Sequence, residues 1–477
     1  MATQSAVTIA QVQATATEGR MRDLRHRQKQ LISLHRQLTE NEAEAISALQ
    51  ADDGFSREEA EFVLAATLDE IRTHYDALDL KKELEVEYGI KRGKSNEQKR
   101  TVQPLAYIVP ETFTLLYSVL AAFAAATEAG TCCVFKFDNN LLSTPPLLGR
   151  IFAQLYDKEA VSITTSEPDT SLIESWLVVD QTGNADVGPG AEKYLPSRPE
   201  SLSLGVVDRT ANVKAAAREL VQSRLAFRGS SRQAVDWVLV NEFAVEEFLD
   251  AVIENIKAWP QASGAKKETD TRNADLEALA AVGSQEVFDR PGVGSVTKTV
   301  LGRKHNGFLG RKIASRILSV DVVTSLDDAI DRLSNSGIEL GAVYIFAGLK
   351  EAKYLSQYIP ARVSFVNHIP RRFHIGPVPA LRYPVSDRTR YTRQMFEFSS
   401  PQFVVSTRAA VKEDTGKLLR EARRPLKPTG QPKAGAIGFF EVGVYLGATF
   451  YLLPFAAFGL AGIGFGLHKG WELYRGL

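Results

Sequence analysis

Cysteine is the strongest nucleophile among the side chains. This chain of 477 residues contains two cysteines, Cys132 and Cys133, side by side in the segment TCCVFKF. The segment is apolar, rich in strand-forming residues and followed by a polar DNN turn, which predicts a buried strand. Because neighbouring residues of a strand point to opposite faces, we expect the two thiols to diverge. No CxxC or Cys/His spacing accompanies them, so we expect no metal site and interpret both as small buried hydrophobes.

A second candidate for chemistry is the loop QTGNADVGPG, which follows the apolar segment WLVVD. Its glycines at 183, 188 and 190 permit close approach of the backbone to a phosphate group. No GxGxxG pattern is present, however, and a plain turn explains the same glycines. The loop alone therefore leaves nucleotide binding open.

Composition excludes some function classes. Lys plus Arg and Asp plus Glu both number 57, so no overall positive field points to nucleic acid. Hydrophobic residues make up 44% and charged residues 24%, as in an ordinary globular protein with room for two or three domains. The first residues lack an apolar core of secretory length, so we expect no signal peptide.

The C-terminal part differs from the rest of the chain. Residues 442–466 carry no charge, which predicts a transmembrane helix that we place at 437–467, before a short tail at 468–477. The alternative is a buried helix of a soluble domain. A basic, proline-containing tether at 411–436 precedes the span, and this excess of positive charge predicts a tail-anchored protein with most of the chain in the cytosol. The endoplasmic reticulum membrane fits such an anchor, and the basic cluster could also contact anionic lipid headgroups.

The rest of the chain alternates between strand and helix patterns. A leucine-faced helix is predicted near residues 21–50, and a second one begins at Ser56 with Glu59 as its capping partner. Further on, strands are predicted at TCCVFKF, AVSITTS, WLVVD, SLGVVD, AVDWVLV and GAVYIFA, with helices between them. The polar segment at 259–277 is predicted to be a surface loop. This pattern predicts an α/β protein with parallel sheets in two domains and a cleft between them. We place the domains at 1–208 and 209–400.

The order of these segments resembles the aldehyde dehydrogenase superfamily, most closely its class 3, fatty-aldehyde-type branch. The leading helix is similar to that branch's N-terminal helix, GTCCVFKF to the family's GNAVVLKPSE strand, and TGNADVG to its TGSxxVG cofactor loop. The resemblance covers roughly residues 18–408. It implies an NAD(P)-dependent oxidoreductase in which a cysteine thiolate attacks an aldehyde, a glutamate acts as general base and an asparagine holds the oxyanion. It also implies a homodimer in which a late strand, here at 401–410, is exchanged between protomers.

Aligned position by position, the catalytic residues of the family are missing from this chain. GSSRQAVDWVL places Arg232 where the cysteine belongs, and a guanidinium cannot act as a nucleophile. The glutamate falls on Ser203, the asparagine on Thr112, and the ribose-binding glutamate on or near Lys312. Near the end of the fold, the glycines of a family loop are replaced by Leu381, Arg382, Pro384, Asp387 and Thr389. The matches that survive are Lys136, Thr182, Gly183, Val187 and Gly188, and each of these can equally be structural.

Three functions remain open from the sequence. The first is a catalytically inactive pseudoenzyme that serves as a binding or scaffold protein with a protein partner. This hypothesis predicts no cofactor, and NAD(P) would be the cofactor if one bound. The second is a serine esterase, in which Ser231 (or Ser230) forms an ester beside Arg232 and His368 or His374 supplies the base. The third is an oxidoreductase for apolar or fatty aldehydes. Arg232 could bind a carboxylate or phosphate, or it could pair with an internal acidic residue.

Overall fold

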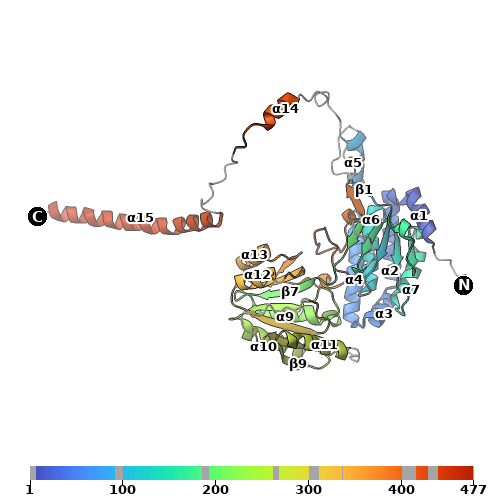
Figure 1. Ribbon diagram of the computed structural model, residues 1–477, viewed down its shortest axis with the longest axis horizontal. Coiled ribbons are helices and arrows are strands. Elements are labelled where there is room, and N and C mark those ends of the chain that lie inside the picture. Colours follow the sequence, from blue (N-terminus) through green and yellow to red (C-terminus); the bar gives the residue numbers. More distant parts are fainter. Residues whose placement is uncertain are drawn as a thin grey trace. The chain divides into compact units, whose positions relative to one another are not determined.

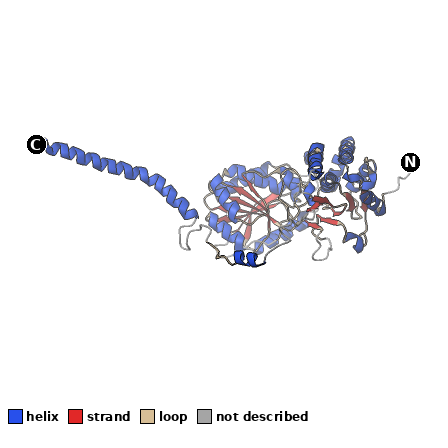
Figure 2. Ribbon diagram, turned by 90° about the horizontal axis from the view of Figure 1, so that it is seen from above, coloured by secondary structure: helices blue, strands red, loops and turns tan. Residues whose placement is uncertain are grey.

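The computed structural model describes residues 7–91, 100–184, 193–261, 268–299, 311–335, 337–399, 415–427 and 439–475. The chain divides into two compact units, Met1–Gln402 and Phe403–Leu477. The described residues of the first unit form two large sheets flanked by helices (Figures 1 and 2) and a small two-stranded sheet. The mostly parallel α/β architecture predicted from the strand and helix pattern is confirmed.

The first sheet has five parallel strands in the order β4-β3-β2-β5-β6. Its strands are β2 (Leu105–Val109), β3 (Cys132–Lys136), β4 (Val161–Thr164), β5 (Leu177–Asp180) and β6 (Tyr194–Pro196). Helix α6 (Leu115–Ala129) is buried along its whole length and packs with α7 (Thr144–Ala153) on one face of the sheet. Val12 of α1 (Ile9–Glu18) packs on the other face. The short α8 (Thr170–Ile173) precedes β5.

The second sheet has seven strands in the order β13-β12-β7-β8-β11-β10-β9, and all are parallel except β9. They are β7 (Leu202–Val207), β8 (Trp237–Asn241), β9 (Ser284–Arg290), β10 (Gly294–Thr299), β11 (Ile317–Val323), β12 (Leu340–Phe346) and β13 (Ser364–Val366). Helices α9 (Val213–Leu225) and α10 (Val245–Ala258) cover one face. Helices α12 (Leu326–Asn335) and α13 (Leu349–Tyr358) cover the other (Figure 1).

The leading helices pack against α6 and α7. The predicted leucine face is confirmed, but the helix is interrupted at Asn41, which separates α2 (Leu24–Glu40) from α3 (Glu42–Asp53). Helix α4 (Arg57–Asp76) begins with the predicted capping box between Ser56 and Glu59. Helix α5 (Leu80–Lys91) follows, and β1 (Arg100–Val102) pairs with β14 (Glu397–Ser399) in a separate two-stranded sheet.

One further prediction from the sequence is wrong, and another falls on residues that the structure does not describe. The prediction of a loop throughout 259–277 is wrong, because α11 (Glu268–Ala281) forms there and buries Asp275 and Leu279. The polar composition concealed a helix whose buried positions are few. The exchanged strand predicted at 401–410 lies outside the described residues, so homodimer formation stays a prediction.

The second unit contains α14 (Thr415–Ala422) and α15 (Phe439–Arg475). Within the part of the chain that the structure describes, no helix combines the length and apolar character that crossing a membrane requires. The transmembrane helix predicted at 437–467 is therefore not supported. Glycines, tyrosines and Pro454 interrupt the apolar side chains of α15. The predicted tail anchor and endoplasmic reticulum location depended on that span and stay predictions.

Candidate functional site

The two cysteines are buried on opposite faces of β3, as predicted. Cys132 is 1% exposed and packs with Val12 and Trp176, whereas Cys133 is 0% exposed and packs with the cluster that contains α6. Burial raises the pKa of the Cys132 thiol to about 12 and also raises that of Cys133. A thiolate is the reactive form of cysteine, so neither side chain is placed or charged to act as a nucleophile.

A cavity of about 250 Å³ lies at the carboxyl ends of β2, β3 and β5. This is the edge at which parallel sheets usually bind ligands. The cavity brings together four residues singled out from the sequence, namely Thr112, Lys136, Thr182 and Arg232. The other lining residues are Val109, Pro110, Glu111, Leu115, Phe137, Asp138, Asn140, Pro145 and Asn184. We take this cavity as the candidate functional site.

Arg232 forms an ion pair inside this cavity. Its Nη2 lies 3.4 Å from Oε1 of Glu111, and the side chains of Arg232 and Glu111 are 40% and 7% exposed. The backbone N–H of Glu111 donates to Oε1 of Gln181, and Gln181 in turn donates from Nε2 to the carbonyl of Ser118. The alternative that Arg232 pairs with an internal acidic residue is therefore confirmed. Glu111 could not be recognised from the sequence as the partner of Arg232, because it lies 121 residues before it.

A left-handed backbone segment precedes Ser230. Phe227 and Arg228 have φ of 52° and 59°, and Gly229 has φ of 70°. Non-glycine residues pay a conformational cost in this region, so the surrounding structure must hold them. The backbone N–H of Phe227 donates to Oε1 of Glu59 at 2.7 Å, and its ring packs edge-on against Phe55 at 5.4 Å. Contacts from the leading helices therefore fix the loop that carries Arg232.

Ser231 is not paired with a base. Within the described residues its hydroxyl bonds to Gln233, donating to Oε1 at 3.5 Å and accepting from the backbone N–H at 3.2 Å. His368 lies 3.3 Å from Glu219 and is 68% exposed. Burial and nearby arginines lower the pKa of His374 to about 3, and its ring lies 6.4 Å from that of Tyr344. Among the described residues, neither histidine forms a hydrogen bond or ion pair with Ser231.

Ser203 belongs to a buried charge cluster around Asp236. The backbone N–H of Ser203 donates to Oδ2 of Asp236 at 2.9 Å, and Nζ of Lys312 lies 3.2 Å from the same oxygen. Arg224 lies 3.8 Å from Oδ1. Burial lowers the pKa of both Lys312 and Arg224, although Asp236 opposes this effect. Ser203 and Lys312 are thus engaged in holding the fold.

Asp180, at the end of β5, organises the glycine-containing loop. Its Oδ1 accepts from the backbone N–H groups of Thr182 and Gly183 at 2.9 and 3.0 Å and from the Thr182 hydroxyl at 2.8 Å. Tyr194 donates to its Oδ2 at 2.9 Å. These backbone N–H groups would otherwise be available to a phosphate. Val187 and Gly188 lie outside the described residues.

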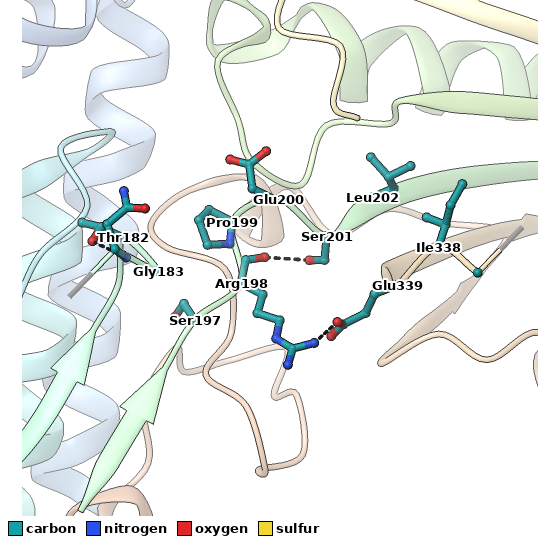
Figure 3. A pocket seen from close by; sticks show the side chains of 12 residues that line it. Thr182, Gly183, Ser197, Arg198, Pro199, Glu200, Ser201, Leu202, Ile338 and Glu339 are labelled. Atoms are coloured by element: carbon teal, nitrogen blue, oxygen red, sulfur yellow. Dashed lines mark hydrogen bonds and ion pairs between the residues drawn. The ribbon is translucent and has the colours of Figure 1, made fainter. Parts of the chain in front are cut away.

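Figure 3 shows a second cavity, which has a volume of about 390 Å³. It shares Thr182 and Asn184 with the first cavity. Arg198 and Glu339 form an ion pair in its wall, and the Ser201 hydroxyl donates to the carbonyl of Arg198 at 2.8 Å. The remaining lining residues are Gly183, Ser197, Pro199, Glu200, Leu202, Gly337 and Ile338. None of the described residues that line this cavity is a histidine or a cysteine.

Comparison with known proteins identifies the family. The sequence profile of the aldehyde dehydrogenase family matches residues 1–273, which is more than half of the chain. The chain belongs to the aldehyde dehydrogenase family. No curated protein matches it.

The solved structures that are similar include other aldehyde dehydrogenases. The putative aldehyde dehydrogenase PutA from Anabaena variabilis has a TM-score of 0.65 and 14% identity, over 81% of this chain and 90% of that protein. KauB from Pseudomonas aeruginosa has a TM-score of 0.63 and 15% identity, over 81% and 86%. A NAD-dependent benzaldehyde dehydrogenase from Corynebacterium glutamicum has a TM-score of 0.59 and 15% identity, over 77% and 86%. At these identities the likeness establishes the shared fold.

Among the residues that the structure describes, those around the first cavity do not fit the NAD(P) that the aldehyde dehydrogenase family implies. The N–H groups of Thr182 and Gly183 already donate to Asp180. The ammonium group of Lys136 lies 2.7 Å from Glu167, and the carboxylate of Glu111 lines the same cavity. A pyrophosphate would lose the usual backbone donors and meet a carboxylate instead.

Proposed function

We propose that this member of the aldehyde dehydrogenase family does not oxidise aldehydes and instead serves as a binding or scaffold protein. The observation that carries the proposal is the location of the two cysteines. Both are buried in the cores on either side of β3, while Arg232 occupies the aligned position of the nucleophile and faces the cavity. The resemblance of the leading helix and of the cofactor loop supports placing the protein in the class 3, fatty-aldehyde-type branch.

The surrounding residues support the same proposal. The thiolate mechanism needs a general base and oxyanion donors as well as the thiol. At the aligned positions, Ser203 is buried with its backbone bound to Asp236, and Thr112 has no amide side chain. Arg232 and Glu111 fill part of the vacated space with an ion pair. The remaining cavity suits a small polar ligand that contacts the Arg232 guanidinium.

The first test is aldehyde oxidation by the purified full-length chain. Reduced nicotinamide would be followed with NAD or NADP and with aldehydes ranging from acetaldehyde to long aliphatic ones. We expect no formation of reduced nicotinamide above the background measured without protein. We also expect that Arg232→Cys alone does not restore turnover, because Ser203 stands at the aligned position of the general-base glutamate. Aldehyde-dependent formation of reduced nicotinamide that scales with wild-type protein would overturn the proposal.

A second test separates ligand binding from catalysis. A thermal-shift screen of small carboxylates, phosphates and NAD(P) would compare the wild type with Arg232→Ala. A ligand of the cavity is expected to raise the midpoint of the wild type and to have a smaller effect on the variant. Lys353→Ala, which alters an exposed lysine of α13, is the control. A cavity role is contradicted if every ligand shifts all three proteins equally.

A further inference from the structure

The segment 415–427, which we call the basic segment, carries a high density of positive charge. It contains α14 and the five residues that follow, and Glu421 is its one acidic residue. Its five basic residues are Lys417, Arg420, Arg423, Arg424 and Lys427. The formal charge of these thirteen residues is therefore +4, in a chain whose overall charge is zero. This density of positive charge favours contact with an anionic partner over burial in a folded core.

The same segment exposes large aliphatic side chains. Leu418, Leu419 and Leu426 are 55%, 47% and 99% exposed, and no residue of α14 is buried. Helical spacing places Leu418, Leu419 and Ala422 on one side of α14, whereas Lys417 and Arg420 project from the other side. A helix with this division is amphipathic, and its apolar side has no partner among the described residues.

The positive charge and the exposed leucines of the basic segment together indicate the nature of its partner. An acidic protein or polyanion would satisfy the cations but leave the leucines in water. The surface of an anionic bilayer offers charged headgroups and an apolar interior within a few ångströms. Helix α15 of the same unit also exposes large apolar side chains, among them Val444 at 70% and Phe450 at 78%. A continuous lipid surface can cover both helices, whereas a protein partner would need a matched groove for each.

We propose that the basic segment binds the surface of anionic lipid bilayers. Its arginines and lysines contact the headgroups, and Leu418 and Leu419 insert at the boundary with the acyl chains. Two signals acting together, charge and aliphatic insertion, give stable attachment where either alone is weak. The proposal concerns attachment to a surface and is independent of the function proposed for the cavity.

The test is flotation of the full-length protein with vesicles of phosphatidylcholine alone or with phosphatidylserine added. The wild type is compared with a triple variant, Arg420→Glu/Arg423→Glu/Arg424→Glu. The matched control, Arg25→Glu/Lys214→Glu/Lys353→Glu, makes the same change of charge at exposed sites in the first unit. A second variant, Leu418→Asp/Leu419→Asp, removes the aliphatic contacts.

We expect the wild type to float with phosphatidylserine vesicles and to be released by salt. The triple variant should bind at least about tenfold more weakly, since each basic residue near an anionic surface contributes on the order of 1 kcal/mol. The control should bind like the wild type, and the leucine variant should also bind more weakly. The proposal is overturned if binding is equal on both kinds of vesicle, or if the triple variant and the control behave alike. The proposal would also be overturned if the protein bound a soluble polyanion but not the vesicles. Vesicle binding that survives every variant and alkaline extraction would overturn it too, because it would indicate insertion through α15.

Discussion

Raising the pH should remove a specific part of the stability of the first unit, because a buried histidine is held between two glutamates. Nδ1 of His74 lies 2.6 Å from Oε2 of Glu128, and its Nε2 lies 3.9 Å from Oε1 of Glu70. Burial by itself would lower the pKa of His74, but the hydrogen bonds and charges of the two carboxylates raise it to about 9. The cluster joins α4 to α6, and Glu70 also accepts from the Tyr117 hydroxyl.

The sign and size of the effect follow from the shift in pKa. A pKa that is higher in the folded state than in the unfolded chain means that the protonated histidine stabilises the fold. This stabilisation is complete below about pH 6.5, the ordinary pKa of histidine, and is lost as the pH rises through 9. The rise in the pKa of His74 from about 6.5 to about 9 corresponds to roughly 3 kcal/mol. The interior site is little screened by solvent, so most of this amount should be measurable.

The assay is urea unfolding followed by tryptophan fluorescence at about pH 6 and about pH 9.5, for the wild type and His74→Gln. At the lower pH the variant should unfold at a much lower urea concentration, because two buried carboxylates lose their cation. At the higher pH most of the difference should disappear. His368→Gln, at an exposed histidine, is the control and should behave like the wild type at both values. A gap between wild type and His74→Gln that is the same at both pH values would refute the reasoning.

Three further predictions concern other buried groups. An aromatic disulfide reagent should not react with Cys132 or Cys133 in the native protein and should titrate both only in denaturant; rapid native labelling would contradict their burial. Asp236→Asn should lower the free energy of unfolding by about 3–5 kcal/mol, because the buried Arg224 and the partly buried Lys312 lose their counter-charge, whereas Asp387→Asn at an exposed site should change it little. Burial raises the pKa of Asp53 to about 7, so its contribution to stability is lost as the pH rises from about 4 through 7. The melting temperature of Asp53→Asn, measured relative to that of the wild type, should therefore be higher at pH 8 than at pH 5. A relative melting temperature that is lower at pH 8 than at pH 5 would exclude this interpretation.

Much of the fold follows from local patterns. The alternation of strand and helix segments predicted the mostly parallel sheets, and the two adjacent cysteines were predicted to point to opposite faces of β3. Periodicity and capping residues act within a few positions of the chain, so they can be recognised without a structure. The segments with weak periodicity were less accessible. A polar composition concealed α11, and the interruption at Asn41 was not predicted.

The sequence by itself determined where the two cysteines lie and which residue stands at the aligned position of the family's nucleophile. A chain with two cysteines in one apolar strand, and an arginine at the aligned nucleophile position, cannot place a thiolate in the cavity. The tertiary structure decided which partners the residues at these aligned positions have. Glu111 pairs with Arg232 across 121 residues, and Asp236 holds Lys312 across 76. Such partners are selected by the three-dimensional approach of separate elements and by the cost of burying an unpaired charge, and neither is written in the spacing of residues along the chain.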